Sequence, residues 1–256
     1  MGNGILGMSQ GLLGSKALLA GGGEQVDFFI HGYTDTKFTV FGWDIYLTTT
    51  HISMIIVIAS ILVFAIFANR AIKKADPNKV PGPFLNVVEL IVESLDGMVA
   101  SSMGSKKALK FRNYVSALFF FILVCNLSGL LGLRPPTADY GVTLPLGLIT
   151  FALVQGCGIA KNKGKHFTNL FKPVPILFPI NLIGEFAVPL SLSLRLFGNI
   201  MSGTVMMGLI YGLLPIFLKL GIPAALHVYF DVFSGAIQTY VFCMLTMVYI
   251  DRKSVV

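Results

Sequence analysis

Long apolar segments separated by short basic ones constrain the fold of this chain more than any other feature. The 256 residues are 55% hydrophobic and only 12% charged, and their mean hydropathy is +0.79. In a typical soluble domain about 25% of the residues are charged. Several apolar segments reach the roughly 20 residues that a helix needs to cross a bilayer. The sequence therefore predicts an all-α integral membrane protein and not a globular enzyme with a large core.

Basic residues gather in the segments that flank the apolar runs. Fourteen of the 19 lysines and arginines lie at 69–112, at 161–172, or at Arg252 and Lys253. Basic loops of this kind lie on the cytoplasmic side of a membrane. The pattern predicts a multi-pass protein of the lipid bilayer with its N-terminus outside and its C-terminus in the cytoplasm. It does not indicate nucleic-acid binding.

We expect an outer N-terminal segment, 1–43, followed by a single membrane domain, 44–256. This domain should contain a first span, an interfacial amphipathic helix, a transmembrane hairpin and a long C-terminal hairpin, at 44–68, 83–104, 113–160 and 174–250. The second element combines acidic residues with apolar residues at helical spacing, which suits an interface better than a span. The stretch 174–220 is longer than one span needs, so it forms either two crossing helices or one long tilted or bent helix.

The three cysteines are expected to be small buried hydrophobic residues. Their spacing fits neither a metal site nor a disulfide framework. No cofactor and no metal is expected. The cysteines lie in apolar stretches, at Cys125, Cys157 and Cys243.

Arg195 gives the most direct indication of function. It lies in a long apolar stretch in which Glu185 is the only other charge nearby. An arginine cannot lose its proton to escape a low dielectric, and one at the centre of a membrane helix costs about 2.5–3.5 kcal/mol on insertion scales. We therefore expect the protein to work around a fixed intramembrane charge. Glu185 either lines a path that opens to the cytoplasm or simply lies near the interface.

Other polar residues surround this charge in the helical pattern. At 100° per residue, Asn199 shares the face of Arg195, and Thr204 lies about 180° away. In the last apolar stretch, one helical face carries a polar stripe made of His227, Asp231, Ser234 and Gln238. Such a stripe either relays protons or small cations or supplies a static Arg195–Asp231 ion pair. Its surplus of titratable and amide groups favours the relay.

Small residues line the helix that carries Arg195. They permit either close packing of a neighbouring helix or the movement of another helix past a smooth surface. These residues are Gly198, Ser202, Gly203, Gly208 and Gly212.

Four stretches together resemble subunit a of F-type ATP synthases, in its bacterial style. They are SLRLFGNIMSG, IQTYVFCMLTMVYI, PPTADYGVTL and FKPVPILFPINLI. The resemblance covers most of the chain from about residue 40, in the right order. An arginine motif followed by a glutamine 43 residues later, here Arg195 and Gln238, is highly specific.

The resemblance implies the non-catalytic stator subunit of a membrane ion motor, with the nucleotide chemistry on other subunits. Its partners would be a ring of c subunits that each bear one carboxylate, the peripheral-stalk b subunits and the rest of the ATP synthase complex in a bacterial inner membrane. Two offset half-channels would load and unload protons or Na⁺ on the ring. Arg195 would correspond to the essential arginine, with Asn199 and Gln238 as its polar partners. The family also favours one long tilted helix at 174–220.

This chain departs from one pattern of the family. Many members carry a glutamate nine residues after the arginine, where this chain has Thr204, and a histidine or glutamate at the position of Asp231. The resemblance then implies an outer half-channel that relies on Asp231 with His227, while Thr204 only forms hydrogen bonds. Some members place the acid before the arginine one turn earlier than Glu185.

The alternative is a stand-alone carrier or channel in which Arg195 binds an anionic substrate. Carriers often contain internal repeats, and this sequence shows none. A purely structural scaffold does not explain the buried polar residues.

Overall fold

Five helices of this protein are long and apolar enough to cross a membrane. The computed structural model describes residues 32–40, 43–75, 82–162, 178–213, 215 and 221–255. In this part of the chain the candidate spans are Thr49–Lys74, Leu109–Leu131, Tyr140–Lys161, Phe178–Leu213 and Pro223–Lys253. The predicted fold class, an all-α multi-pass membrane protein, is confirmed.

A short antiparallel hairpin precedes the first of these helices. It consists of β1 (Gly32–Val40) and β2 (Trp43–Thr48), and β2 leads directly into α2 (Thr49–Lys74). The sequence predicted a first span from about residue 44, and the helix itself begins at Thr49. The segment WDIYLT is rich in aromatic and β-branched residues, which favour a strand. Residues 1–31, 41 and 42 of the expected outer segment lie outside the described residues.

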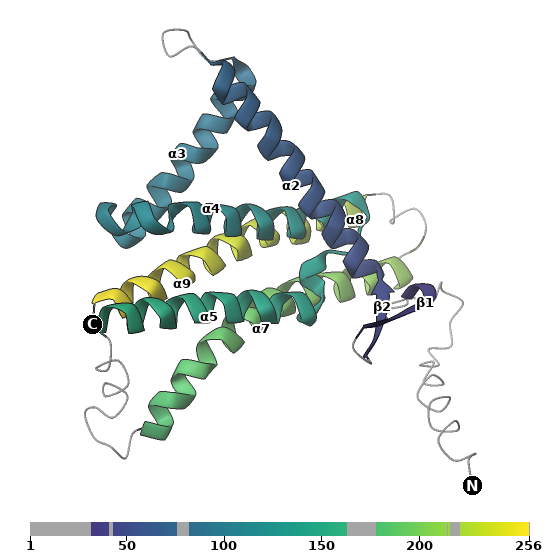
Figure 1. Ribbon diagram of the computed structural model, residues 1–256. Helices are drawn as coiled ribbons and strands as arrows, with labels where there is room; N and C mark the ends of the chain where they lie inside the picture. Colours follow the sequence, from purple (N-terminus) through teal and green to yellow (C-terminus); the bar gives the residue numbers. More distant parts are fainter. Residues whose placement is uncertain are drawn as a thin grey trace.

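The amphipathic helix is α3 (Pro83–Met103). Gly82 precedes a proline at the first helical position, and Gly104 ends the helix with a φ of 72°; both are common helix boundaries. The buried side of α3 packs on the next helices, and the exposed side carries Glu89 and Glu93. An ion pair of 3.0 Å between Asp96 and Arg112 joins α3 to the following helix. Figure 1 shows α2 and α3 meeting at an open angle.

The central hairpin consists of α4 (Ser105–Leu127) and α5 (Tyr140–Asn162). Two short 3₁₀ turns connect them, η1 (Ser128–Leu131) and η2 (Pro136–Ala138). Asp139 precedes α5, and its carboxylate accepts a hydrogen bond of 2.9 Å from the backbone N–H of Gly141. This bond satisfies one of the backbone donors that the start of a helix leaves free.

The long apolar stretch that the sequence left ambiguous forms one helix over its described part, α7 (Phe178–Leu213). Pro189 lies inside it, and a proline removes one helical hydrogen bond and bends the helix. Figure 1 shows α7 changing direction between its first turns and the part beside the C-terminal helices. Residues 174–177, 214 and 216–220 of the expected hairpin lie outside the described residues.

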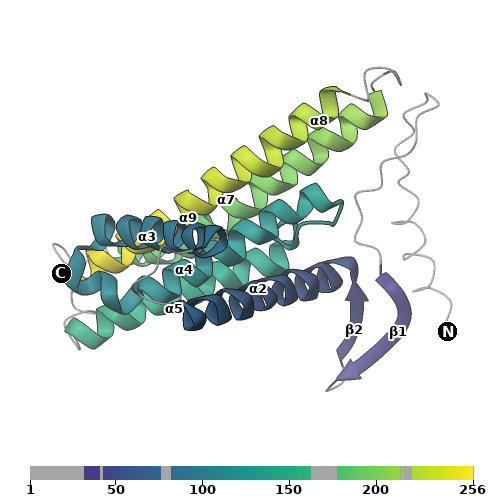
Figure 2. The ribbon, with the colours of Figure 1, turned by 90° about the horizontal axis from the view of Figure 1, so that it is seen from above.

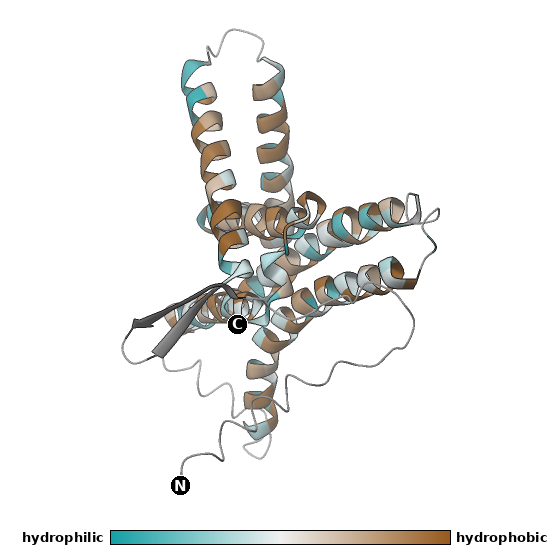
Figure 3. Ribbon diagram, turned by 90° about the vertical axis from the view of Figure 1, so that its right-hand side faces the viewer, coloured by the Kyte–Doolittle hydropathy of each residue, from teal (hydrophilic) through white to brown (hydrophobic). Residues whose placement is uncertain are grey.

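The C-terminal run returns alongside α7. It comprises α8 (Ile222–His227), a π-helical segment η4 (Val228–Ser234) and α9 (Gly235–Val255). Figure 2 shows this run and α7 extending side by side beyond the other helices. The buried apolar core lies where α4, α5, α7 and α9 meet, with Ile122, Leu196 and Phe242 among its members. Hydrophobic residues also cover the outer sides of the helices (Figure 3), as expected for surfaces that face lipid.

Candidate functional site

Arg195 lies on an exposed face of α7. Leu192 and Leu196 flank it on the buried side and fix the orientation of the helix. The exposed side also carries small residues at helical spacing, Ser191 and Gly198 among them. Among the residues that the structure describes, none forms a hydrogen bond or ion pair with Arg195. The guanidinium group is therefore presented outward on a smooth strip of the helix surface.

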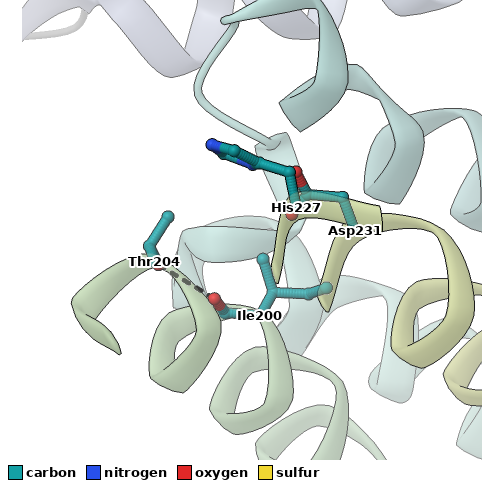
Figure 4. A network of polar contacts seen from close by, with 4 residues as sticks. All are labelled: Ile200, Thr204, His227 and Asp231. Atoms are coloured by element: carbon teal, nitrogen blue, oxygen red, sulfur yellow. Dashed lines mark hydrogen bonds and ion pairs between the residues drawn. The ribbon is translucent and has the colours of Figure 1, made fainter. Parts of the chain in front are cut away.

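Asp231 pairs with a residue of its own helical run and not with Arg195. Its Oδ2 lies 2.7 Å from Nδ1 of His227, and the two side chains are 20% and 34% exposed. Figure 4 shows these two side chains together, beside the turn of α7 that carries Ile200 and Thr204. The static Arg195–Asp231 pair that the sequence allowed is absent from the described residues. Asp231 and His227 thus form a separate, partly exposed acid–base pair.

Gly129 in η1 packs against the carboxylate of Asp231. A Cβ atom placed on Gly129 would lie 3.3 Å from Cγ and 3.4 Å from both carboxylate oxygens of Asp231. The carboxylate therefore rests against bare backbone. The sequence reasoning missed this residue, because nothing in the sequence marks one glycine among 27 as a contact of an acid on a distant helix.

Ser234 and Asn199 join the C-terminal run to α7. The Ser234 hydroxyl donates a hydrogen bond of 2.9 Å to Oδ1 of Asn199. Asn199 lies one helical turn after Arg195. This contact therefore fixes the position of η4 relative to the helix that carries the arginine.

The π-helical segment divides the predicted polar stripe. A π-helix closes i→i+5 hydrogen bonds and so takes up one more residue per turn than an α-helix. Compared with a continuous α-helix, the residues before the π-helical segment are therefore rotated about the helix axis by about 100° relative to the residues after it. Asp231, inside the segment, remains partly exposed, whereas Gln238, after it, is only 8% exposed. Within the described part of the chain, Nε2 of Gln238 has no hydrogen-bond partner.

Thr204 is bonded to its own helix. Its hydroxyl donates to the backbone carbonyls of Ile200, at 2.8 Å, and Met201, at 3.0 Å. It faces the His227–Asp231 pair in Figure 4. A threonine at this position adds a hydroxyl to the polar surroundings but no titratable group.

Glu185 belongs to a second polar cluster at the other end of α7. Its carboxylate accepts hydrogen bonds from Lys253, near the end of α9, and from Gln155 on α5. Glu185 precedes Arg195 by ten residues, or roughly 15 Å along a helix. The sequence reasoning did not identify Lys253 or Gln155 as its partners, because three separate helices bring them together.

Asn126 is a buried polar residue that the sequence reasoning also missed. It is 1% exposed and bonds to three groups on two elements. Its Nδ2 donates to the Gly235 carbonyl at 3.0 Å and to Oγ1 of Thr239 at 3.2 Å. Its Oδ1 accepts from the hydroxyl of Thr137 at 2.8 Å. The sequence feature that could have identified it is an asparagine directly after Cys125, at the end of an apolar span.

The described residues contain no group of three or more His, Cys, Asp or Glu side chains that could hold a metal ion. The cysteines of the spans are free thiols. The polar groups described above are carboxylates, an imidazole, amides and hydroxyls. They lie on two sides of Arg195 along the chain.

Comparison with known proteins places these residues in a family. Residues 51–251 match the family model described as ATP synthase A chain. The sodium ion specific ATP synthase subunit a of Propionigenium modestum is 39% identical over 180 residues, which cover 64% of this chain and 61% of that protein. ATP synthase subunit a of Staphylococcus saprophyticus is 35% identical over 236 residues, covering 85% of this chain and 95% of that protein. For the Limosilactobacillus fermentum protein of the same name the identity is 34% over 250 residues, 91% and 98% of the two chains.

Proposed function

Because this chain belongs to the ATP synthase subunit a family, whose members are the ion-translocating, non-catalytic membrane subunits of F-type ATP synthase, we propose that Arg195 is its point of ion exchange. At this point ions leave and re-enter a rotating ring of c subunits. The other partners are the peripheral-stalk b subunits. A stand-alone carrier is not favoured by the family match.

The observation that carries this proposal is the outward, unpaired position of Arg195. A membrane-embedded arginine is costly unless a counter-charge or water compensates it. Among the described residues no carboxylate reaches this guanidinium. A carboxylate on another subunit, passing the smooth strip of α7, supplies the missing partner. Exposed small residues such as Gly198 and Ser202 let that subunit approach closely.

The electrostatics of such an encounter favour release of the bound ion. Two opposite unit charges about 4 Å apart interact by about 4 kcal/mol at an effective dielectric of 20. The attraction applies to the ionised carboxylate and not to its protonated or ion-loaded form. A carboxylate that reaches Arg195 therefore gives up its ion. The same fixed charge repels cations and prevents a direct leak across the membrane.

Two polar clusters on opposite sides of Arg195 serve as the half-channels. The His227–Asp231 pair, with Thr204 nearby, forms one of them; Thr204 follows Arg195 by nine residues, roughly 14 Å along the helix. Glu185 with its partners Gln155 and Lys253 lies on the other side. The basic ends of α2 and α9 support an orientation in which the second cluster faces the cytoplasm of a bacterium and the first faces the outside, by the positive-inside bias. Ions then cross the membrane only by travelling with the ring.

The test replaces Asp231 by asparagine in the whole ATP synthase, reconstituted into vesicles. ATP-driven pumping is measured with protons and with Na⁺, because a sodium ion specific protein is among the relatives. We expect a large loss of pumping by Asp231→Asn with the complex intact. The control, Asp96→Asn, removes a carboxylate that pairs with Arg112 between α3 and α4 and should pump normally. Unchanged flux in Asp231→Asn would refute its place in the path.

A further inference from the structure

We propose that Asn126, Thr137 and Thr239 form a buried clamp that holds the π-helical turn η4 in place and thereby positions Asp231 and Ser234. The clamp is made of three side chains from three separate elements. The effect of the clamp on ion pumping rests on the ion path proposed above, whereas its effect on the geometry of η4 does not.

Asn126 is bonded at both ends of its amide. Both Nδ2 donors are used, toward the Gly235 carbonyl and toward Oγ1 of Thr239, and Oδ1 accepts from Thr137. Thr137 and Thr239 are fully buried. Loss of one partner leaves buried polar groups unpaired, which costs more than the bond itself contributes. The three side chains therefore act as one unit that fixes α4, η2 and α9 relative to one another.

The clamp acts at the junction where the π-helical segment ends. Gly235 is the first residue of α9 and directly follows Ser234, the last residue of η4. A Cβ on Gly235 would lie 3.0 Å from Cβ of Asn126, so α9 and α4 touch closely there. The Gly235 carbonyl accepts two side-chain hydrogen bonds, from Asn126 at 3.0 Å and from Thr239 at 2.8 Å. These bonds hold this carbonyl directly after the π-helical turn.

A π-helical turn needs such support because it is rare and the α-helical pattern competes with it. If the segment relaxed to an α-helix, the part that carries Asp231 and Ser234 would rotate by about 100° relative to α9. Ser234 would then lose its bond to Asn199, and Asp231 would leave its place against Gly129. The clamp prevents this change and keeps the acid on the side where it meets His227.

Thr246 provides a matched control within the same helix. It is fully buried, and its hydroxyl donates to the Phe242 carbonyl at 2.8 Å. Thr239 makes the same bond one helical turn back, to Gly235, but also accepts the hydrogen bond from Asn126. Replacing either threonine by valine removes one buried hydroxyl. Only Thr239→Val affects the clamp.

The test reports the geometry of η4 directly in the assembled complex. Asn199→Cys and Ser234→Cys are introduced together, with the native cysteines replaced by alanine, and a short thiol cross-linker is applied in vesicles. The clamp predicts efficient cross-linking with Thr246→Val or Thr239→Ser. It predicts a yield about fivefold lower with Thr239→Val, the change expected for losing one buried hydrogen bond of about 1 kcal/mol. Equal yields in all variants would overturn the proposal.

Ion pumping is measured in parallel in complexes that keep Asn199 and Ser234. Thr239→Val should pump more slowly than Thr246→Val, and Thr239→Ser should restore the rate. A lost cross-link with unchanged pumping would keep the clamp and contradict the proposed role of Asp231 instead. Thr137→Val repeats the test from the other end of the Asn126 amide. Its control is Thr143→Val, at a buried threonine whose hydroxyl donates to the Tyr140 carbonyl and not to Asn126.

Discussion

Gly147 lies at a close contact between α5 and α7, and replacing it by alanine should force the two helices apart. A Cβ at this position would lie 2.8 Å from the backbone oxygen of Pro189 and 3.3 Å from Cβ of Ser193. Carbon–oxygen contacts normally lie at about 3.3–3.6 Å, so the helices must separate locally by roughly 0.5–0.8 Å. The obstacle is backbone and cannot turn away. Overpacking of this kind costs about 1–3 kcal/mol.

Gly156 in the same helix offers a control for the same substitution. Nothing lies within 4 Å of a Cβ added there. Both changes gain the same helix propensity, up to about 1 kcal/mol, so the difference between them isolates the steric cost at Gly147. We expect Gly147→Ala to be less stable than Gly156→Ala by about 1–3 kcal/mol.

The assay heats the detergent-solubilised complex and follows the retention of this subunit in it. Gly147→Ala should release the subunit several degrees below Gly156→Ala. Ion pumping should also fall, because Pro189 lies only six residues, about 9 Å, before Arg195 on the same helix. Equal thermal stability and equal pumping of the two variants would refute the close approach of α5 and α7.

Two further changes test the clusters on either side of the arginine. Lys253→Gln removes the cation that pairs with the carboxylate of Glu185 and should alter the rate of ion pumping several-fold. The control, Arg252→Gln, changes the exposed neighbour and should pump at the normal rate. Equal pumping of the two variants would contradict a role for this ion pair. Gly129→Ala brings a methyl group to 3.3 Å from the Asp231 carboxylate and should slow pumping moderately, because the acid must shift by a few tenths of an ångström. Gly97→Ala, where the added Cβ meets nothing within 4 Å, should pump at the normal rate, and a matching rate for the Gly129 variant would show that the contact is unimportant.

Much of the fold followed from the sequence, because hydrophobic length and helical spacing are local properties. Five apolar segments predicted the spans, and the acids of α3 set it apart from them. The length of the stretch 174–220 allowed two crossing helices, yet α7 continues through Pro189 as one helix over its described part. A proline removes one hydrogen bond but does not end a helix whose sides are packed, and the contact with Gly147 stabilises it there.

The candidate site was predictable in its residues but not in its contacts. Arg195, Asn199 and Asp231 stood out as polar groups in apolar stretches. Their arrangement depends on the π-helical turn, which the sequence pattern does not encode, since its spacing alone predicted one α-helical stripe from His227 to Gln238. Glu185 contacts residues of two other helices, and Asn126 contacts the end of η4 from another helix. In each case the two residues are more than 25 positions apart along the chain. Only packing brings them together.

The most direct test of the account replaces Arg195 by alanine and measures two properties of the same vesicles. The first is ATP synthesis driven by an ion gradient in the intact complex. The second is passive ion flux after the catalytic sector has been stripped away. An outward, unpaired charge that unloads the ring and blocks leakage predicts an assembled complex with no ATP synthesis and a raised passive flux. Wild-type ATP synthesis with unchanged flux in Arg195→Ala would contradict the central claim.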